Sequence, residues 1–114
     1  MSDLNINPDK IYQKLVDLGS QYADALYAYE LMAETEKSAL AELMTRQGGK
    51  SNAENETLAR ASKEFQQRIQ DTVLLKREML QAKVKYESAK KWADLIQTKA
   101  ANLRVEYKAA GRMT

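Results

Sequence analysis

The sequence contains neither cysteine nor histidine. Disulfides, thiolate or imidazole metal sites, and nucleophilic centres that use an imidazole base are therefore excluded. Only a carboxylate site remains formally open, and the Glu-x-x-His pattern of di-iron helical bundles cannot occur without histidine. We therefore predict no catalytic residue, no metal ligand and no cofactor, and we expect the protein not to be an enzyme.

Residues that interrupt helices are scarce: the chain has one proline and four glycines in 114 residues. So few turn-forming residues argue against a β fold, which needs many tight turns. The hydrophobic content of 44% is too high for a wholly disordered chain. Composition and length together predict a single all-α domain over residues 1–114.

Long uncharged apolar runs are also missing, so no membrane span or membrane partner is expected. The start of the chain, residues 1–5, has neither a basic segment nor an apolar core of the kind found in secretion signals. We therefore expect a cytoplasmic protein.

The few helix breakers indicate where helices begin and end. Asn7 before Pro8 is typical of a helix start, because asparagine can cap free amides and proline suits the first helical position. Gly48 and Gly49 are expected to supply the left-handed residues that end a helix. Ser51 followed by Glu54 fits a capping box for a second helix.

These signals predict an antiparallel αα-hairpin with a short helix over about 8–47 and a long helix over about 52–110. Residues 48–51 form the turn, and residues 1–7 and 111–114 are expected to be flexible ends, the second beginning at Gly111. At Gly19 and Ser20 the sequence allows two alternatives for the first helix. Either a new helix starts at Ser20, or one helix continues and accepts about 1 kcal/mol for the glycine. Apolar residues keep their phase across this point, which favours continuity.

The long helix carries a heptad stripe of apolar and small residues. Alternating steps of three and four give Leu58, Ala61, Phe65, Arg68, Thr72, Leu75, Met79, Ala82, Tyr86, Ala89, Ala93, Ile96, Ala100, Leu103, Tyr107 and Ala110. Only Arg68 and Thr72 depart from the pattern, which is typical of a coiled coil. We call this set the seam.

The short helix offers a matching stripe with one polar exception, Glu36. Its members are Ile11, Leu15, Leu18, Tyr22, Ala25, Tyr29, Met32, Glu36, Ala39 and Leu43. A hairpin folded at Gly48 and Gly49 would place residue 8 beside about residue 91. At 1.5 Å per residue the long helix would then extend about five turns past the start of the short one.

The part of the seam beyond the short helix is the predicted interface. Its candidate residues are Trp92, Ala93, Ile96, Ala100, Leu103 and Tyr107. A second, patchier apolar stripe follows Ile69, Val73, Leu80, Val84, Leu95 and Val105. One short helix cannot cover both stripes, and exposed apolar strips are typical of interfaces. We therefore expect self-association into a helical bundle, most simply an antiparallel dimer with a four-helix core.

Charge is divided unevenly along the chain. Residues 1–47 carry four Lys/Arg and eight Asp/Glu, a net −4, and residues 48–114 carry fourteen and eight, a net +6. Candidate phosphate-contacting cations lie near the end of the long helix: Lys90, Lys91, Lys99, Arg104 and Lys108. The alternative is that cations of the long helix pair with acids of the short one. The predicted register puts Asp24 near Lys76 and Asp17 near Lys83.

The Asn-Pro start, the Gly-Gly tip and the lysine-rich segment Tyr86-Glu87-Ser88-Ala89-Lys90-Lys91-Trp92-Ala93-Asp94-Leu95 resemble the small helical accessory proteins of bacteriophages. The resemblance lies in the general composition of residues 50–110, and no individual functional residue is carried over. It implies a non-enzymatic cytoplasmic protein that modulates a DNA-processing machine.

Two functions are therefore expected from the sequence. The first is a helical interaction protein that binds itself and another protein. The alternative is a nucleic-acid-binding module that uses the basic C-terminal half of the long helix.

Overall fold

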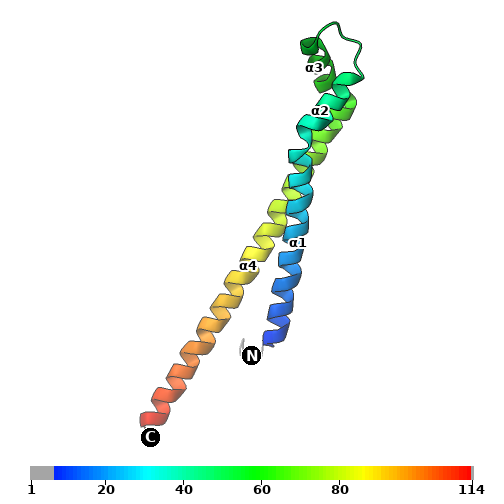
Figure 1. The fold of residues 1–114 in the computed structure, drawn as a ribbon. Coiled ribbons are helices and arrows are strands. Elements are labelled where there is room, and N and C mark those ends of the chain that lie inside the picture. The colour runs from blue at the N-terminus through cyan, green and yellow to red at the C-terminus, as the bar shows by residue number, and fades with distance from the viewer. Residues whose placement is uncertain (1–6, 114) are drawn as a thin grey trace. The chain divides into compact units, whose positions relative to one another are not determined.

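The computed structural model describes residues 7–113, and every regular element in that range is a helix. The helices are α1 (Pro8–Glu34), α2 (Glu36–Thr45), α3 (Asn52–Ala61) and α4 (Lys63–Met113), as labelled in Figure 1. The predicted all-α class is therefore confirmed over these residues. The helix boundaries differ from the prediction, because each of the two predicted helices contains a break.

The described part of the chain divides into two compact units. Residues 22–81 form the central unit, and the described residues 7–21 and 82–113 form the terminal unit. The central unit holds the end of α1, all of α2 and α3, and the start of α4. The terminal unit holds the start of α1 and the rest of α4.

Helix α1 begins where the sequence predicts. Pro8 is its first residue, and the side-chain oxygen Oδ1 of Asn7 accepts a hydrogen bond from the backbone N–H of Asp9 at 2.8 Å. The helix then runs through Gly19 and Ser20 without a break, so the continuous alternative is confirmed. Residues 1–6, most of the predicted flexible N-terminus, lie outside the described residues.

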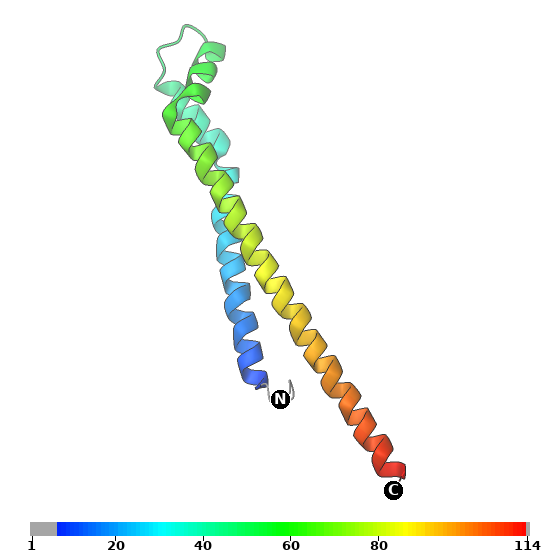
Figure 2. The same ribbon diagram turned by 180° about the vertical axis from the view of Figure 1, so that it is seen from behind.

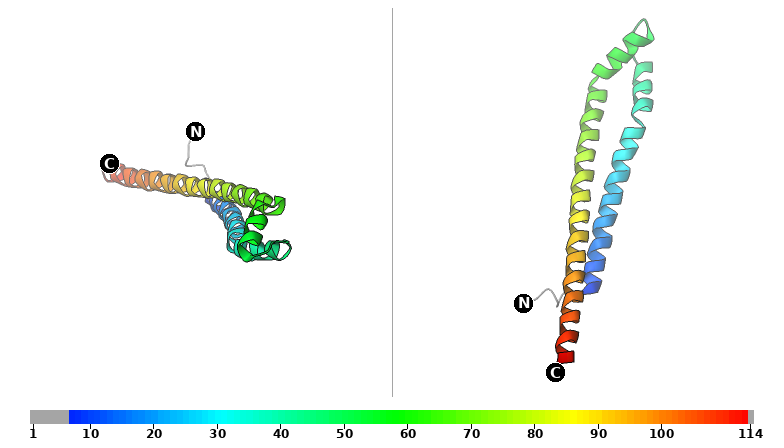
Figure 3. Two further views of the ribbon diagram at one scale, coloured as in Figure 1. Left: turned by 90° about the horizontal axis from the view of Figure 1, so that it is seen from above. Right: turned by 90° about the vertical axis from the view of Figure 1, so that its left-hand side faces the viewer.

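The first unpredicted break falls at Thr35, between α1 and α2 (Figure 3). The Thr35 hydroxyl donates to the carbonyl of Leu31 at 2.6 Å, a local bond that competes with regular helix geometry. The side chain of Arg68 also bonds at this break. The predicted single helix over 8–47 is therefore two helices.

The glycines in the connection between α2 and α3 have a different role from the predicted one. None of the described glycines has a positive φ, so the expectation that Gly48 and Gly49 adopt left-handed conformations is wrong. Instead, the backbone N–H of Gly49 donates to Oδ1 of Asn55 at 2.8 Å. A Cβ on Gly49 would collide with that same oxygen, so close approach explains the glycine.

The predicted cap at Ser51 is present. The hydroxyl oxygen of Ser51 accepts from the N–H of Glu54 at 3.1 Å and caps α3. The Glu54 carboxylate reaches back to the N–H of Lys50 at 3.1 Å, one residue earlier than in the standard capping box.

The second unpredicted break falls at Ser62, between α3 and α4. Ser62 has an extended backbone (φ −66°, ψ 151°), and its hydroxyl donates to the carbonyl of Ala59 at 2.6 Å. The same oxygen accepts from the N–H of Phe65 at 3.2 Å, which makes Ser62 the N-cap of α4. One hydroxyl thus ends one helix and starts the next.

Helix α4 continues without interruption to Met113 (Figure 2). The predicted end at residue 110 is therefore too early, because the helix passes through Gly111. No neighbour within 4 Å would meet a Cβ at Gly111. A single glycine costs about 1 kcal/mol in a helix, which is too little to end one that is otherwise favourable.

Burial follows the predicted seam over most of α4. Every seam position from Phe65 to Leu103 is buried or half-buried, and the stripe of α1 from Ile11 to Met32 is half-buried throughout. Both ends of the seam differ: Leu58 and Ala61 are exposed at one end, and Tyr107 and Ala110 at the other. The exposure of Leu58 follows from the corner at Ser62, which turns Ala59 inward instead.

The apolar core of the central unit lies where α2, α3 and the start of α4 meet. It consists of Leu40, Leu43, Ala59 and Phe65, with Met44 packed against them. Ala59 is fully covered, and Phe65 is 3% exposed. Arg60 lies over the Phe65 ring, 5.9 Å from its centroid, and Arg46 bridges Glu42 at 2.7 Å and Glu64 at 3.1 Å.

Candidate functional site

The six predicted interface residues lie on α4 within the terminal unit, and they differ strongly in exposure. Ala93 is 4% exposed, and Ile96, Ala100 and Leu103 are half-buried. Trp92 is 45% exposed and Tyr107 is 70% exposed. The two aromatic residues therefore offer most of the apolar area that a partner could cover.

The position of Gly19 corrects the predicted register. A Cβ on Gly19 would lie 3.1 Å from Cε1 of Tyr86, so the tyrosine ring occupies the space that glycine leaves open. The predicted register put residue 80 opposite Gly19, six residues earlier. Counting outward from this contact at equal rise, Pro8 lies beside about residue 97, and about 16 residues of α4 extend past it. On this count, the part of α4 beyond the start of α1 would be shorter than predicted.

The second apolar stripe is exposed, as predicted. The exposed fractions are 39% for Ile69, 61% for Val73, 46% for Leu80, 63% for Val84, 61% for Leu95 and 66% for Val105. Large aliphatic side chains so exposed along one helix offer apolar surface to another molecule.

The five candidate phosphate-contacting cations also lie on α4 in the terminal unit, and all are exposed. The ammonium Nζ of Lys90 lies 4.8 Å from the centroid of the Tyr86 ring, a cation–π distance. Lys91, Arg104 and Lys108 form no ion pair with a described acid. Their charges therefore remain available to an anionic partner.

The predicted interhelical ion pairs are wrong. Among the described residues, neither Asp24 with Lys76 nor Asp17 with Lys83 forms an ion pair. Asp17 instead accepts from Nε2 of Gln13 at 2.9 Å, on its own helix. The register shift at Gly19 explains the terminal-unit pair, because Lys83 no longer lies opposite Asp17.

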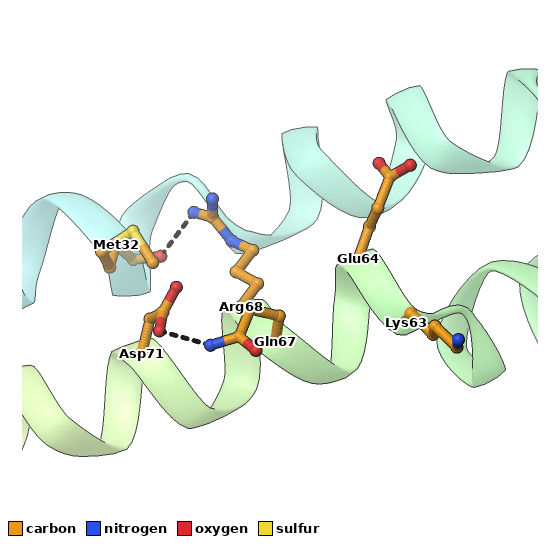
Figure 4. Close-up of a pocket in the computed structure, with 6 residues that line it drawn as sticks. All are labelled: Met32, Lys63, Glu64, Gln67, Arg68 and Asp71. Atoms are coloured by element: carbon orange, nitrogen blue, oxygen red, sulfur yellow. Dashed lines mark hydrogen bonds between the residues drawn. The ribbon is translucent and has the colours of Figure 1, made fainter.

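A polar site around Arg68 in the central unit was not predicted from the sequence (Figure 4). Nη2 of Arg68 donates to the carbonyl of Met32 at 2.9 Å and to the Thr35 hydroxyl at 2.6 Å. Nε of Arg68 is buried and has no hydrogen-bond partner. The signal was visible as the polar exception in the seam. Arg68 bonds to Thr35, the residue before Glu36, which is the polar exception of the stripe on the short helix.

A hollow of about 510 Å³ adjoins this arginine. Its lining residues are Met32, Lys63, Glu64, Gln67, Arg68 and Asp71 (Figure 4). Two cations and two carboxylates face it, and Gln67 donates from Nε2 to Asp71 at 2.9 Å. The guanidinium of Arg68 already donates to the Met32 carbonyl and to the Thr35 hydroxyl at the end of α1. These bonds stabilise the break between α1 and α2.

Within residues 7–113, no group of three acidic side chains is placed to hold a metal ion. None of the helices in that range is long and apolar enough to cross a membrane. No protein-family model matches the chain, and neither curated proteins nor solved structures give a significant match.

Proposed function

We propose that this chain is a non-enzymatic helical interaction protein that self-associates into a bundle through the end of α4. In this proposal α1 and α4 pair as an antiparallel coiled coil, and a second copy covers the seam where α1 does not reach. The supporting observation is the exposure of Trp92 and Tyr107 at 45% and 70%, next to the half-buried Ile96 and Leu103.

The spacing of residues supports a helix as the partner. Small residues at Ala93 and Ala100 allow another helix to approach closely, and aromatic residues contribute strongly to association energies. Leaving this strip in water would forgo about 25 cal/mol for each Å² of apolar area. Association therefore has a clear source of free energy.

Sedimentation equilibrium at micromolar concentrations tests the proposal. The 13.0 kDa chain should give species of twice that mass or more. Changing Trp92 and Tyr107 together to Ala should weaken association by about tenfold or more, because two exposed anchors are lost. Tyr12→Ala is the matched control, since Tyr12 is an equally exposed tyrosine on α1 (69%). A wild-type chain that stays at 13.0 kDa throughout would refute self-association.

The resemblance to small helical bacteriophage accessory proteins extends this proposal to a partner protein in DNA processing. A pull-down from the native host with the wild-type chain, compared with the Trp92 and Tyr107 double variant, tests that extension. Recovery of a DNA-processing protein by the wild type alone supports it. Equal recovery by both chains contradicts the role of this surface.

A second candidate function, binding to nucleic acid, is favoured by the exposed cations of α4. Lys91, Arg104 and Lys108 form no ion pair with a described acid, and Lys90 lies beside the Tyr86 ring. Binding through such residues should weaken steeply with salt. Fluorescent single- and double-stranded DNA titrated at about 50 and 200 mM salt tests this, with Lys90, Lys91 and Arg104 changed to Glu as the comparison. Absence of binding at the lower salt would exclude this function.

A further inference from the structure

Within the central unit, α1 presents an acidic face with apolar residues at its centre. Between residues 22 and 34 the chain carries three acids, Asp24, Glu30 and Glu34, and no cation. Tyr27 and Leu31 are 68% and 49% exposed, and helical spacing places them on the same side as these acids. We call these five residues the acidic face.

Within the terminal unit, α4 presents a surface of opposite charge. Val84, Trp92 and Leu95 are 63%, 45% and 61% exposed, and helical spacing places them on one side between Lys85 and Lys91. From residue 82 to residue 111 the chain carries seven Lys/Arg and three Asp/Glu, a net +4. We call these five residues the basic face.

We propose that the basic face of α4 in one copy packs against the acidic face of α1 in a second copy. This inference rests on the proposed self-association and adds to it a contact on the side of α4 next to the seam, with Trp92 common to both surfaces. Like charges oppose contact between two acidic faces or between two basic faces, whereas an acidic face meeting a basic face gains charge complementarity. Apolar centres match as well, since Tyr27 and Leu31 can cover Trp92 and Leu95.

The second copy is the occupant that the observations favour. Each chain carries one acidic and one basic face, so two copies supply both halves of the contact in equal number. An interface in which patch A meets patch B, and B meets A, is the pattern of a symmetric dimer. Neither face has a tertiary ion pair to lose: none of the ion pairs between described residues involves Asp24, Glu30, Lys85 or Lys91.

Charge reversal in the full-length chain tests the pairing. One variant carries Asp24→Lys and Glu30→Lys, and the other carries Lys85→Glu and Lys91→Glu. Each alone should associate about tenfold or more weakly than the wild type, because one of its faces then repels the other. Mixed in equal amounts, with one variant isotopically labelled, the two should form a mixed species that native mass spectrometry detects. The emission of the sole tryptophan, Trp92, should lie at shorter wavelength in the mixture than in either variant alone, because the partner then covers its ring.

The control is a chain with Lys37→Glu and Lys50→Glu, two exposed lysines outside both faces. It has the same change in net charge as the α4 variant and should associate like the wild type. Variants that associate normally by themselves, or a mixture that fails to recover association, would overturn the pairing of these faces while leaving self-association intact. A monomeric wild type would instead refute the proposed function itself. Circular dichroism of each variant should show unchanged helix content.

Discussion

The central and terminal units solve the problem of covering apolar surface in different ways. In the central unit two helix breaks fold α2 and α3 over the start of α4, so that Leu40, Leu43, Ala59 and Phe65 cover one another. In the terminal unit Ala93 is the one described residue that is buried, and Trp92, Leu95, Val105 and Tyr107 stay at least 45% exposed. Helix breaks thus let one part of a chain form its own core, whereas a straight helix leaves its apolar side to be covered by a neighbour.

The largest expected effect is in the central core. Phe65→Ala should lower the free energy of unfolding by about 3–5 kcal/mol, because a 3% exposed ring is replaced by a cavity. Urea denaturation followed by circular dichroism measures the change. Tyr107→Ala is the control, since that ring is 70% exposed and should change stability little in the monomer. Equal losses at both positions would remove the contrast between the units.

A smaller effect is expected at the break between α1 and α2. Arg68→Ala should cost about 1–2 kcal/mol, because the Met32 carbonyl and the Thr35 hydroxyl lose their donor. Arg68→Met should cost less, because it loses the same hydrogen bonds but keeps an apolar stem of similar length that packs in the same place. Urea denaturation of both variants measures the difference. A larger loss for Arg68→Met than for Arg68→Ala would contradict this account.

Removing the hydroxyl at the corner between α3 and α4 should lower stability by about as much as the loss of one helix cap. Ser62→Ala should cost about 1 kcal/mol, because one hydroxyl serves both the Ala59 carbonyl and the Phe65 N–H. Thr98→Ala in the terminal unit is the matched change, since its hydroxyl only donates to the Asp94 carbonyl of the same helix. Thermal denaturation should separate the two variants. If Thr98→Ala is as damaging as Ser62→Ala, the corner is not held by its cap.

The smallest effects concern two glycines of the terminal unit. Gly111→Ala should stabilise the helix by up to about 1 kcal/mol, because the new Cβ would meet no packed neighbour beyond the adjacent residues and backbone of its own helix. At Gly19 the same gain should be cancelled, because the new Cβ would lie 3.1 Å from the Tyr86 ring. Changing Tyr86 to Leu in the Gly19→Ala background should restore the gain. Thermal denaturation of the three variants provides the measurement.

Features set by neighbours in the sequence could be predicted. The start at Pro8, the cap at Ser51 and the seam from Phe65 to Leu103 depend on spacing within one helix, and all appear in the structure. The exposed second stripe was predicted on the same basis.

Features that depend on contacts between distant residues could not be predicted. The break at Thr35 involves Arg68, which is 33 residues away. The register between α1 and α4 is set where the Tyr86 ring fills the space at Gly19. The spacing of apolar residues within one helix does not show which residue of the other helix lies opposite. The corner at Ser62 was nevertheless visible in principle, as a serine followed by Glu64 in the first turn of a helix. The seam positions keep their spacing on both sides of Ser62, so the apolar pattern predicted one continuous helix there.

The unbroken course of α4 from Lys63 to Met113 makes the chain unequally tolerant of changes in length. One residue inserted between Ala82 and Ala93 would rotate everything after it by about 100° and turn Ile96 and Leu103 away from their present side. An insertion at Gly48 would lengthen only the connection before α3 and would leave every helix in phase. Natural or engineered length variants should therefore accumulate at that connection and be rare along the long helix.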